Sequence, residues 1–209
     1  TTENYWGGEV HEFREKMSGV LHRLLAHRSI TIEADDATLP PVVESTAFGH
    51  ASAEAMQAVF AHTQEGFAYS RLGNPTVACL EDRITALSGG RGTVAVASGM
   101  SAVALALLAI VRSGDHIVAG KHVFGGTFTL LETTFPRLGI TTTWVDARDG
   151  EAVQQALTPA TRAVLVEAIA NPAMIVPDFE RIQAACRAAG IPLIVDATLV
   201  TPLLFDAEA

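Results

Sequence analysis

Hydrophobic and polar positions along the chain follow different patterns on the two sides of about residue 61. Between Val10 and Leu25, apolar side chains recur at helical spacing and predict an amphipathic helix. An irregular segment follows, because the consecutive prolines Pro40 and Pro41 exclude a continuous helix. We interpret residues 1–60 as an N-terminal arm, which packs either on its own chain or on a neighbouring subunit, and residues 61–209 as an α/β domain.

From Asn74 onward, short apolar runs alternate with segments of helical period. Asn74 is a typical N-cap before Pro75, and Gly89-Gly90 is a typical stop, so a helix is predicted over 75–88. Strands of this kind alternating with helices form a mainly parallel sheet flanked by helices. The helix over 100–112 is apolar on every side, which predicts that it is fully covered. The predicted strands cover residues 93–97, 116–119, 141–145, 163–166 and 191–195, and the further helices cover 100–112, 127–138, 150–157 and 178–189.

Composition narrows the class of protein. Of the 209 residues, 49% are hydrophobic and 18% are charged, as expected for one well-packed domain with an appendage. The net charge of −9, without a basic cluster, argues against nucleic acid or an anionic membrane as a partner. The longest apolar run, residues 102–111, is too short to span a bilayer, and no signal peptide is visible, which favours a cytoplasmic protein.

Cysteine and histidine positions give no sign of a disulfide or a metal site. Cys79 and Cys186 lie in helical patterns far apart in the sequence, and we expect both to be buried, free thiols in a reducing compartment. The seven histidines have no metal-ligand spacing, so no metal is expected.

Polar and glycine residues gather after the predicted strands. In open parallel sheets, ligands bind outside the carboxyl ends of the strands. Ser98-Gly99 begins a helix there, and this turn is either a site for a phosphate or carboxylate at the helix N-terminus or an ordinary strand–helix turn. Gly89-Gly90 precedes its strand, which is the wrong order for a dinucleotide fingerprint, and no Walker-type loop is present. The candidates at the ends of the later strands are Phe124 with Gly125-Gly126, Glu167, Asn171 and Asp196, which is expected to be buried because it directly follows a buried strand.

A flat phosphorylated heterocycle with a basic ring nitrogen would use all of these groups. Pyridoxal 5′-phosphate is such a molecule, because its phosphate binds at a helix N-terminus, an aromatic side chain stacks on its ring, and a carboxylate holds the pyridinium proton. We therefore predict pyridoxal phosphate as the cofactor.

Five motifs in this order resemble the Cys/Met metabolism (transsulfuration) family of pyridoxal-phosphate enzymes, and the likeness covers about residues 38–209. The resemblance implies the large domain of an aspartate aminotransferase-like enzyme of fold type I. The motifs are Tyr69-Ser-Arg71-Leu-Gly-Asn74-Pro75-Thr76, Ser98-Gly99-Met100, Phe124-Gly-Gly-Thr127, Glu167-x-x-x-Asn171-Pro172 and Asp196-x-Thr198-x-x-Thr201-Pro202.

The resemblance also implies roles for the residues of these motifs. Ser98, Gly99 and Met100 form the phosphate turn, in which Gly99 and Met100 offer backbone N–H groups. Tyr69 and Arg71 reach the phosphate of a neighbouring subunit in a homodimer, usually within a homotetramer. Phe124 stacks on the ring, Asn171 binds its phenolic oxygen, and Thr198 supports the ring or the aspartate. Asp196 binds the ring nitrogen and is the expected catalytic residue, whereas Glu167 stands behind these groups.

Two departures from the family pattern bear on activity. The ring-stacking position is usually tyrosine and here is Phe124, which has no hydroxyl group to exchange a proton. This favours γ-replacement on an O-acylhomoserine by a sulfur nucleophile, as in sulfhydrylases and cystathionine γ-synthases of methionine biosynthesis. The motifs fit a methionine or cystathionine γ-lyase equally well.

The second departure concerns the Schiff-base lysine, which in the family lies in a Ser-x-Thr-Lys motif a short way beyond the aspartate. The sequence ends at Ala209 without this motif, and its only lysines are Lys16 and Lys121. We therefore expect a cofactor domain that is incomplete at its C-terminus and lacks the small C-terminal domain. The alternative of another class is a non-catalytic, lysine-less interaction subunit.

Overall fold

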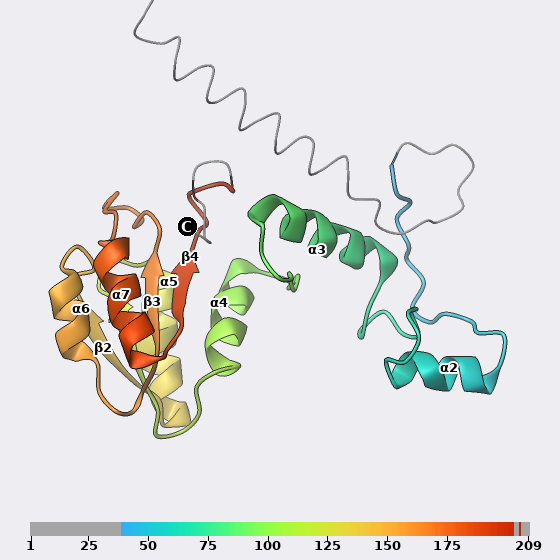
Figure 1. Cartoon of the computed structure of the whole chain (residues 1–209), viewed down its shortest axis with the longest axis horizontal. Helices are drawn as coiled ribbons and strands as arrows, with labels where there is room; N and C mark the ends of the chain where they lie inside the picture. Colours follow the sequence, from blue (N-terminus) through green and yellow to red (C-terminus); the bar gives the residue numbers. More distant parts are fainter. Residues whose placement is uncertain (1–38, 203–204, 206–209) are drawn as a thin grey trace, which may run out of the picture. The chain divides into compact units, whose positions relative to one another are not determined.

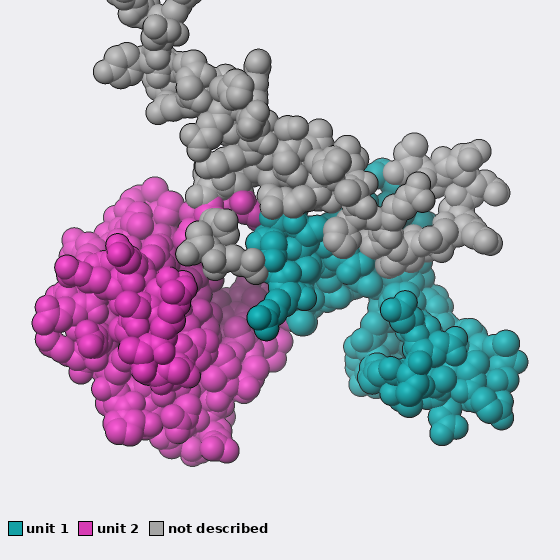
Figure 2. All heavy atoms as spheres, in the orientation of Figure 1, with its two compact units in different colours: residues 1–95, 206–209 teal, residues 96–205 magenta. Residues whose placement is uncertain are grey.

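The computed structural model describes residues 39–202 and 205, so the amphipathic helix predicted near residues 10–25 lies outside the described part. The chain forms two compact units (Figure 2). Unit 1 comprises residues 1–95 and 206–209, and unit 2 comprises residues 96–205. The proposed division into an arm of residues 1–60 and a domain of residues 61–209 stays a prediction.

Unit 2 is built on a parallel sheet of four strands in the order β2-β1-β3-β4 (Figure 1). All three strand pairs are parallel, and Glu167 at the end of β3 lies beside Asp196 at the end of β4. This confirms the predicted α/β class and four of the predicted strands. The strands are β1 (His116–Gly120), β2 (Thr141–Val145), β3 (Thr161–Glu167) and β4 (Leu193–Asp196).

Each face of the sheet carries its own hydrophobic core. Along β1, Ile117 and Ala119 join one core and Val118 joins the other, as the alternation of side chains in a strand requires. The first core also contains Leu107 of α4 (Gly99–Leu108), whereas the second contains Val153 of α6 (Gly150–Ala156) and Ile182 of α7 (Phe179–Ala189). Helices therefore cover both faces, and the carboxyl ends of the strands are left for the loops.

Two helices of unit 2 differ from their predictions. The segment predicted as one helix over 127–138 is divided into α5 (Gly125–Thr129), a π-helix (Leu130–Thr134) and a 3₁₀-helix (Phe135–Leu138). Pro136 accounts for the change, because proline has no N–H group for the α-helical ladder. The prediction that the helix after Gly99 is fully covered is wrong, since Leu105 is 54% exposed and Leu108 is 42% exposed.

Unit 1 contains two helices among its described residues. Helix α3 (Pro75–Ser88) begins at the N-cap Asn74 and ends at Gly89, which adopts the left-handed conformation with φ 72°, as predicted. Helix α2 (Ala53–Phe60) was not predicted, although its N-cap Ser52 accepts a hydrogen bond from the Ala55 N–H group. Buried Cys79 lies on α3 and buried Cys186 on α7, so both cysteines are buried free thiols as expected.

The strand predicted over 93–97 is wrong. No strand of the described residues pairs with this segment, and Val94 is 82% exposed. Side chains of α3 bind it instead: the Glu81 carboxylate accepts the Ala95 N–H group at 2.8 Å, and the hydroxyls of Thr85 and Thr93 lie 2.7 Å apart. An apolar, β-branched run forms a strand only where a neighbouring strand completes its hydrogen bonds.

No helix in the described ranges is long and apolar enough to cross a membrane.

Candidate functional site

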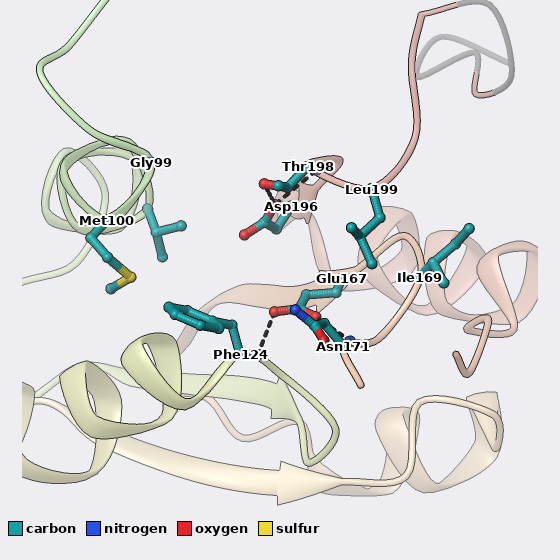
Figure 3. Close-up of a pocket in the computed structure, with 10 residues that line it drawn as sticks. Gly99, Met100, Phe124, Glu167, Ile169, Asn171, Asp196, Thr198 and Leu199 are labelled. Atoms are coloured by element: carbon teal, nitrogen blue, oxygen red, sulfur yellow. Dashed lines mark hydrogen bonds between the residues drawn. The ribbon is translucent and has the colours of Figure 1, made fainter. Parts of the chain in front are cut away.

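A cavity of about 240 Å³ lies within unit 2, at the carboxyl ends of β1, β3 and β4 (Figure 3). Its walls come from the start of α4, the turn after β1, the loop after β3 and the end of β4. The sequence candidates Gly99, Met100, Phe124, Asn171, Asp196 and Thr198 are therefore brought together. The lining residues are Gly99, Met100, Val103, Phe124, Glu167, Ile169, Asn171, Asp196, Thr198 and Leu199.

The first turn of α4 forms one wall. Ser98 caps the helix, because its hydroxyl accepts the Ser101 N–H group at 3.1 Å. The N–H groups of Gly99 and Met100 lie in the turn that has no intrahelical acceptors, and the helix dipole makes this end positive. A Cβ atom at Gly99 would meet nothing within 4 Å, so this side of the turn is open to a ligand.

The Phe124 ring forms a flat wall and is 49% exposed. It follows β1 and precedes α5, and in Figure 3 it lies near Met100 and faces the same space as the Asp196 carboxylate. Gly126 packs closely against it: a Cβ atom there would lie 2.7 Å from Phe124 Cε1 and 3.0 Å from Met100 Sδ. The glycine therefore lets the ring and the methionine approach one another. The sequence named Gly126 as part of the Gly125-Gly126 turn beside Phe124, but its close packing against the ring and Met100 was not predicted.

Asp196 ends β4 and supplies a carboxylate to the cavity. Its Oδ1 accepts the Thr198 N–H group at 3.0 Å and the Thr198 hydroxyl at 2.5 Å. The expectation that this aspartate is buried is wrong, since Asp196 is half-buried and Thr198 is exposed. β4 is an edge strand of the described sheet, so no further strand covers its second side. The Asp196 carboxylate is thus oriented by Thr198 and remains accessible to a donor in the cavity.

Glu167 and Asn171 lie on the loop side of the cavity. Glu167 is buried, and its two carboxylate oxygens accept the backbone N–H groups of Phe124 at 2.5 Å and Asn171 at 3.1 Å. The Asn171 residue is exposed, so its side-chain amide can serve a ligand.

Tyr69 and Arg71 belong to unit 1. The Arg71 guanidinium lies 5.4 Å from the centroid of the Tyr69 ring, and both residues are exposed. Whether they reach a phosphate of a neighbouring subunit stays a prediction.

The charges around the cavity are complementary to a small polar heterocycle. Among the described residues, its lining contains two carboxylates, those of Glu167 and Asp196, and no lysine, arginine or histidine. An anion would therefore bind at the start of α4, where backbone N–H groups and the helix dipole are positive, and away from the carboxylates. Within residues 39–202 and 205, no group of three or more His, Cys, Asp or Glu residues is placed to hold a metal ion.

These groups fit pyridoxal phosphate by their chemistry. The cavity combines an anion site, a flat aromatic face opened by Gly126, and a carboxylate held for a hydrogen-bond donor. A phosphate, a planar ring and a protonated ring nitrogen would use them in that order.

Comparison with known proteins shows the family. Residues 24–207 match the family described as Cys/Met metabolism PLP-dependent enzyme. Homocysteine synthase of Schizosaccharomyces pombe is 40% identical over 158 residues, which are 76% of this chain and 37% of that protein. L-methionine gamma-lyase of Pseudomonas putida is 35% identical over 189 residues, which are 90% of this chain and 48% of that protein.

Solved structures agree with this assignment. A Campylobacter jejuni protein described as an O-acetylhomoserine (thiol)-lyase, which carries N′-pyridoxyl-lysine-5′-monophosphate, superposes with a TM-score of 0.82 at 30% identity. The match covers 88% of this chain and 45% of that chain, so the chain spans less than half the length of each of these three relatives. The architecture is that of the fold type I enzymes, and the cofactor of the family is pyridoxal phosphate. The chain belongs to the Cys/Met metabolism family of pyridoxal-phosphate-dependent enzymes.

Proposed function

We propose that this chain forms the cofactor-binding part of an enzyme that replaces the γ-acyloxy group of an O-acylhomoserine with a sulfur nucleophile. The observation that carries the proposal is the convergence of the α4 N-terminus, the Phe124 ring and the Asp196 carboxylate on one cavity. Bound pyridoxal phosphate supplies an electron-withdrawing ring that stabilises negative charge on the carbon atoms of an amino-acid substrate.

Different residues of the cavity bind different parts of the cofactor. The N–H groups of Gly99 and Met100, in the turn capped by Ser98, bind the phosphate. Phe124 covers one face of the ring and excludes water from it. Asp196, held by Thr198, keeps a proton on the ring nitrogen, because a carboxylate beside the nitrogen favours its charged form. Asn171 donates a side-chain hydrogen bond to the phenolic oxygen, and Tyr69 and Arg71 of a neighbouring subunit add hydrogen bonds and charge at the phosphate.

Phe124 favours replacement over elimination, because it offers no phenolic hydroxyl for proton transfer at the substrate. Among the relatives, homocysteine synthase and O-acetyl-L-homoserine sulfhydrylase of Leptospira meyeri (38% identical over 166 residues) support the same choice. The second candidate is γ-elimination from methionine, which the similarity to L-methionine gamma-lyases of Treponema denticola and Pseudomonas putida supports.

Product analysis separates the two candidates. With O-acetyl-L-homoserine and sulfide, the protein that carries these residues should release acetate and form homocysteine. Formation of 2-oxobutanoate and ammonia from L-methionine, without homocysteine from the first pair, would instead establish the lyase. Failure of this chain to bind a pyridoxal phosphate analogue would remove the basis of both.

A further inference from the structure

Glu167 is the most enclosed polar side chain of the cavity. It ends β3 and is 7% exposed, between the turn that follows β1 and the end of β4. A buried carboxylate is costly unless donors compensate its lost hydration. Within the described part of the chain it has no ion-pair partner, so the compensation comes from hydrogen bonds.

The two oxygens of this carboxylate bind two different loops. Oε1 accepts the N–H group of Phe124 at 2.5 Å, and Oε2 accepts the N–H group of Asn171 at 3.1 Å (dashed lines in Figure 3). Hydrogen bonds of backbone N–H groups to a carboxylate are roughly twice as strong as those between neutral groups. The carboxylate therefore fixes both backbones relative to β3.

The two loops held by Glu167 carry different parts of the site. One carries the Phe124 ring, against which Gly126 packs so closely that a Cβ atom there would lie 2.7 Å from Phe124 Cε1. The other carries the exposed Asn171 side chain. Because the Glu167 side chain at the end of β3 sets both positions, the separation of the Phe124 ring from the Asn171 amide depends on the length and charge of the Glu167 side chain.

We propose that Glu167 is a positioning residue that holds Phe124 and Asn171 at the spacing the cofactor ring requires, without contacting the cofactor itself. The proposal rests on the proposed function, in that the spacing matters only where a pyridoxal-phosphate-like ring is bound.

Two variants and a matched control test it. In Glu167→Gln the amide oxygen still accepts one N–H group, while the amide NH₂ opposes the other. Glu167→Ala removes both acceptors. Glu180→Gln, on the exposed first turn of α7, is the control for loss of a carboxylate in the same unit.

The first measurement is amide hydrogen exchange of the 209-residue chain without ligand. We expect exchange at Phe124 or Asn171 to rise about tenfold in Glu167→Gln and at both in Glu167→Ala, with no change in Glu180→Gln. Unchanged exchange at both amides in Glu167→Gln would overturn the positioning role, whatever the ligand result.

The second measurement is binding of pyridoxine 5′-phosphate, which has no aldehyde and cannot react with the lysines. Glu167→Gln should weaken binding about tenfold and reduce the circular dichroism induced in the bound ring, since a ring held at varied angles gives a smaller signal. Faster exchange with unaltered affinity and dichroism would overturn the proposal. Absence of binding to the unsubstituted chain would instead defeat the proposed function, and the exchange result would still judge the contacts of Glu167.

Discussion

Polar side chains at the two ends of the parallel sheet differ in burial and in how completely the protein satisfies their hydrogen bonds. At the amino end, His116 is buried and both ring nitrogens lie 2.8 Å from threonine hydroxyls, those of Thr161 and Thr143. Buried Asp115 there pairs with Arg162 at 3.1 Å. At the carboxyl end, Asp196 is half-buried, and among the described residues its carboxylate accepts hydrogen bonds from Thr198 alone.

This difference separates stabilising polar groups from functional ones. Groups whose hydrogen bonds are completed within the protein stabilise the fold and have little capacity left for a ligand. Groups at the carboxyl end keep free capacity, and exposed Phe124 beside them leaves apolar surface uncovered. Glu167 lies at the carboxyl end, but both of its carboxylate oxygens already accept backbone N–H groups, as the polar groups at the amino end are satisfied within the protein. It is therefore better suited to positioning other residues than to contacting a ligand.

The largest expected effect is at Asp196. In the protein that carries these residues, Asp196→Ala should lower turnover by about 10²–10³-fold, because a preorganised charge at the ring nitrogen is lost. The midpoint of urea unfolding should change little, since the carboxylate is open to water on its cavity side. Turnover and urea unfolding measured on the same preparation test both parts, and turnover equal to that of the unsubstituted protein would remove Asp196 from the site.

His116→Ala should have the reverse profile. It removes a buried ring together with the hydrogen bonds of both ring nitrogens to the hydroxyls of Thr161 and Thr143, which should lower the free energy of unfolding by about 2–4 kcal/mol. Affinity for pyridoxine 5′-phosphate, measured under conditions where the variant is folded, should be retained. A variant with unaltered unfolding and weakened binding would break the distinction between the two ends.

Lowering the pH should reduce the free energy of unfolding through the same histidine at the amino end of the sheet. Burial lowers the pKa of His116 below its usual value of 6.5, so below that pH the unfolded chain takes up a proton that the folded chain resists. The stability contribution is therefore complete above that pH and declines as the pH falls through it, by at most about 1.4 kcal/mol per pH unit. Urea titrations from about one pH unit above to about one and a half units below the ordinary histidine pKa of about 6.5 should show this slope, and the slope should be absent in His116→Gln.

Arg71 tests whether the carboxyl end receives positive charge from outside unit 2, because the described residues that line its cavity include no cationic side chain. If Arg71 reaches the phosphate of a neighbouring subunit, Arg71→Ala should weaken pyridoxine 5′-phosphate binding about tenfold, with a weaker dependence on salt. Arg91→Ala, another exposed arginine of unit 1, is the control. Equal affinities in the two variants would leave the α4 N-terminus as the phosphate site by itself.

The sequence predicted which residues gather around the cavity better than it predicted how deeply those residues are buried. Phe124, Glu167 and Asp196 were found because strand ends follow from local patterns, and a parallel topology gathers those ends at one edge. Burial and strand pairing depend on segments far away in the sequence, so the strand at 93–97 and the burial of Asp196 were predicted wrongly. The close packing at Gly126 is a matter of tenths of an ångström between side chains, which no spacing rule specifies.

The smallest effect is expected at Lys121, which also follows β1 at the carboxyl end. Its Nζ lies 3.0 Å from Asp146, and Arg148 binds the same carboxylate at 2.7 Å. Hydrogen bonds from Arg148 and then Lys121 hold the pKa of Asp146 well below its usual range, so this half-buried group is saturated like those at the amino end. Salt and water screen such a pair, so its loss should change stability little. Lys121→Met should therefore bind pyridoxine 5′-phosphate with unchanged affinity. A clear loss of affinity would instead show that the Lys121 ammonium group contributes to the phosphate site although it is paired with Asp146.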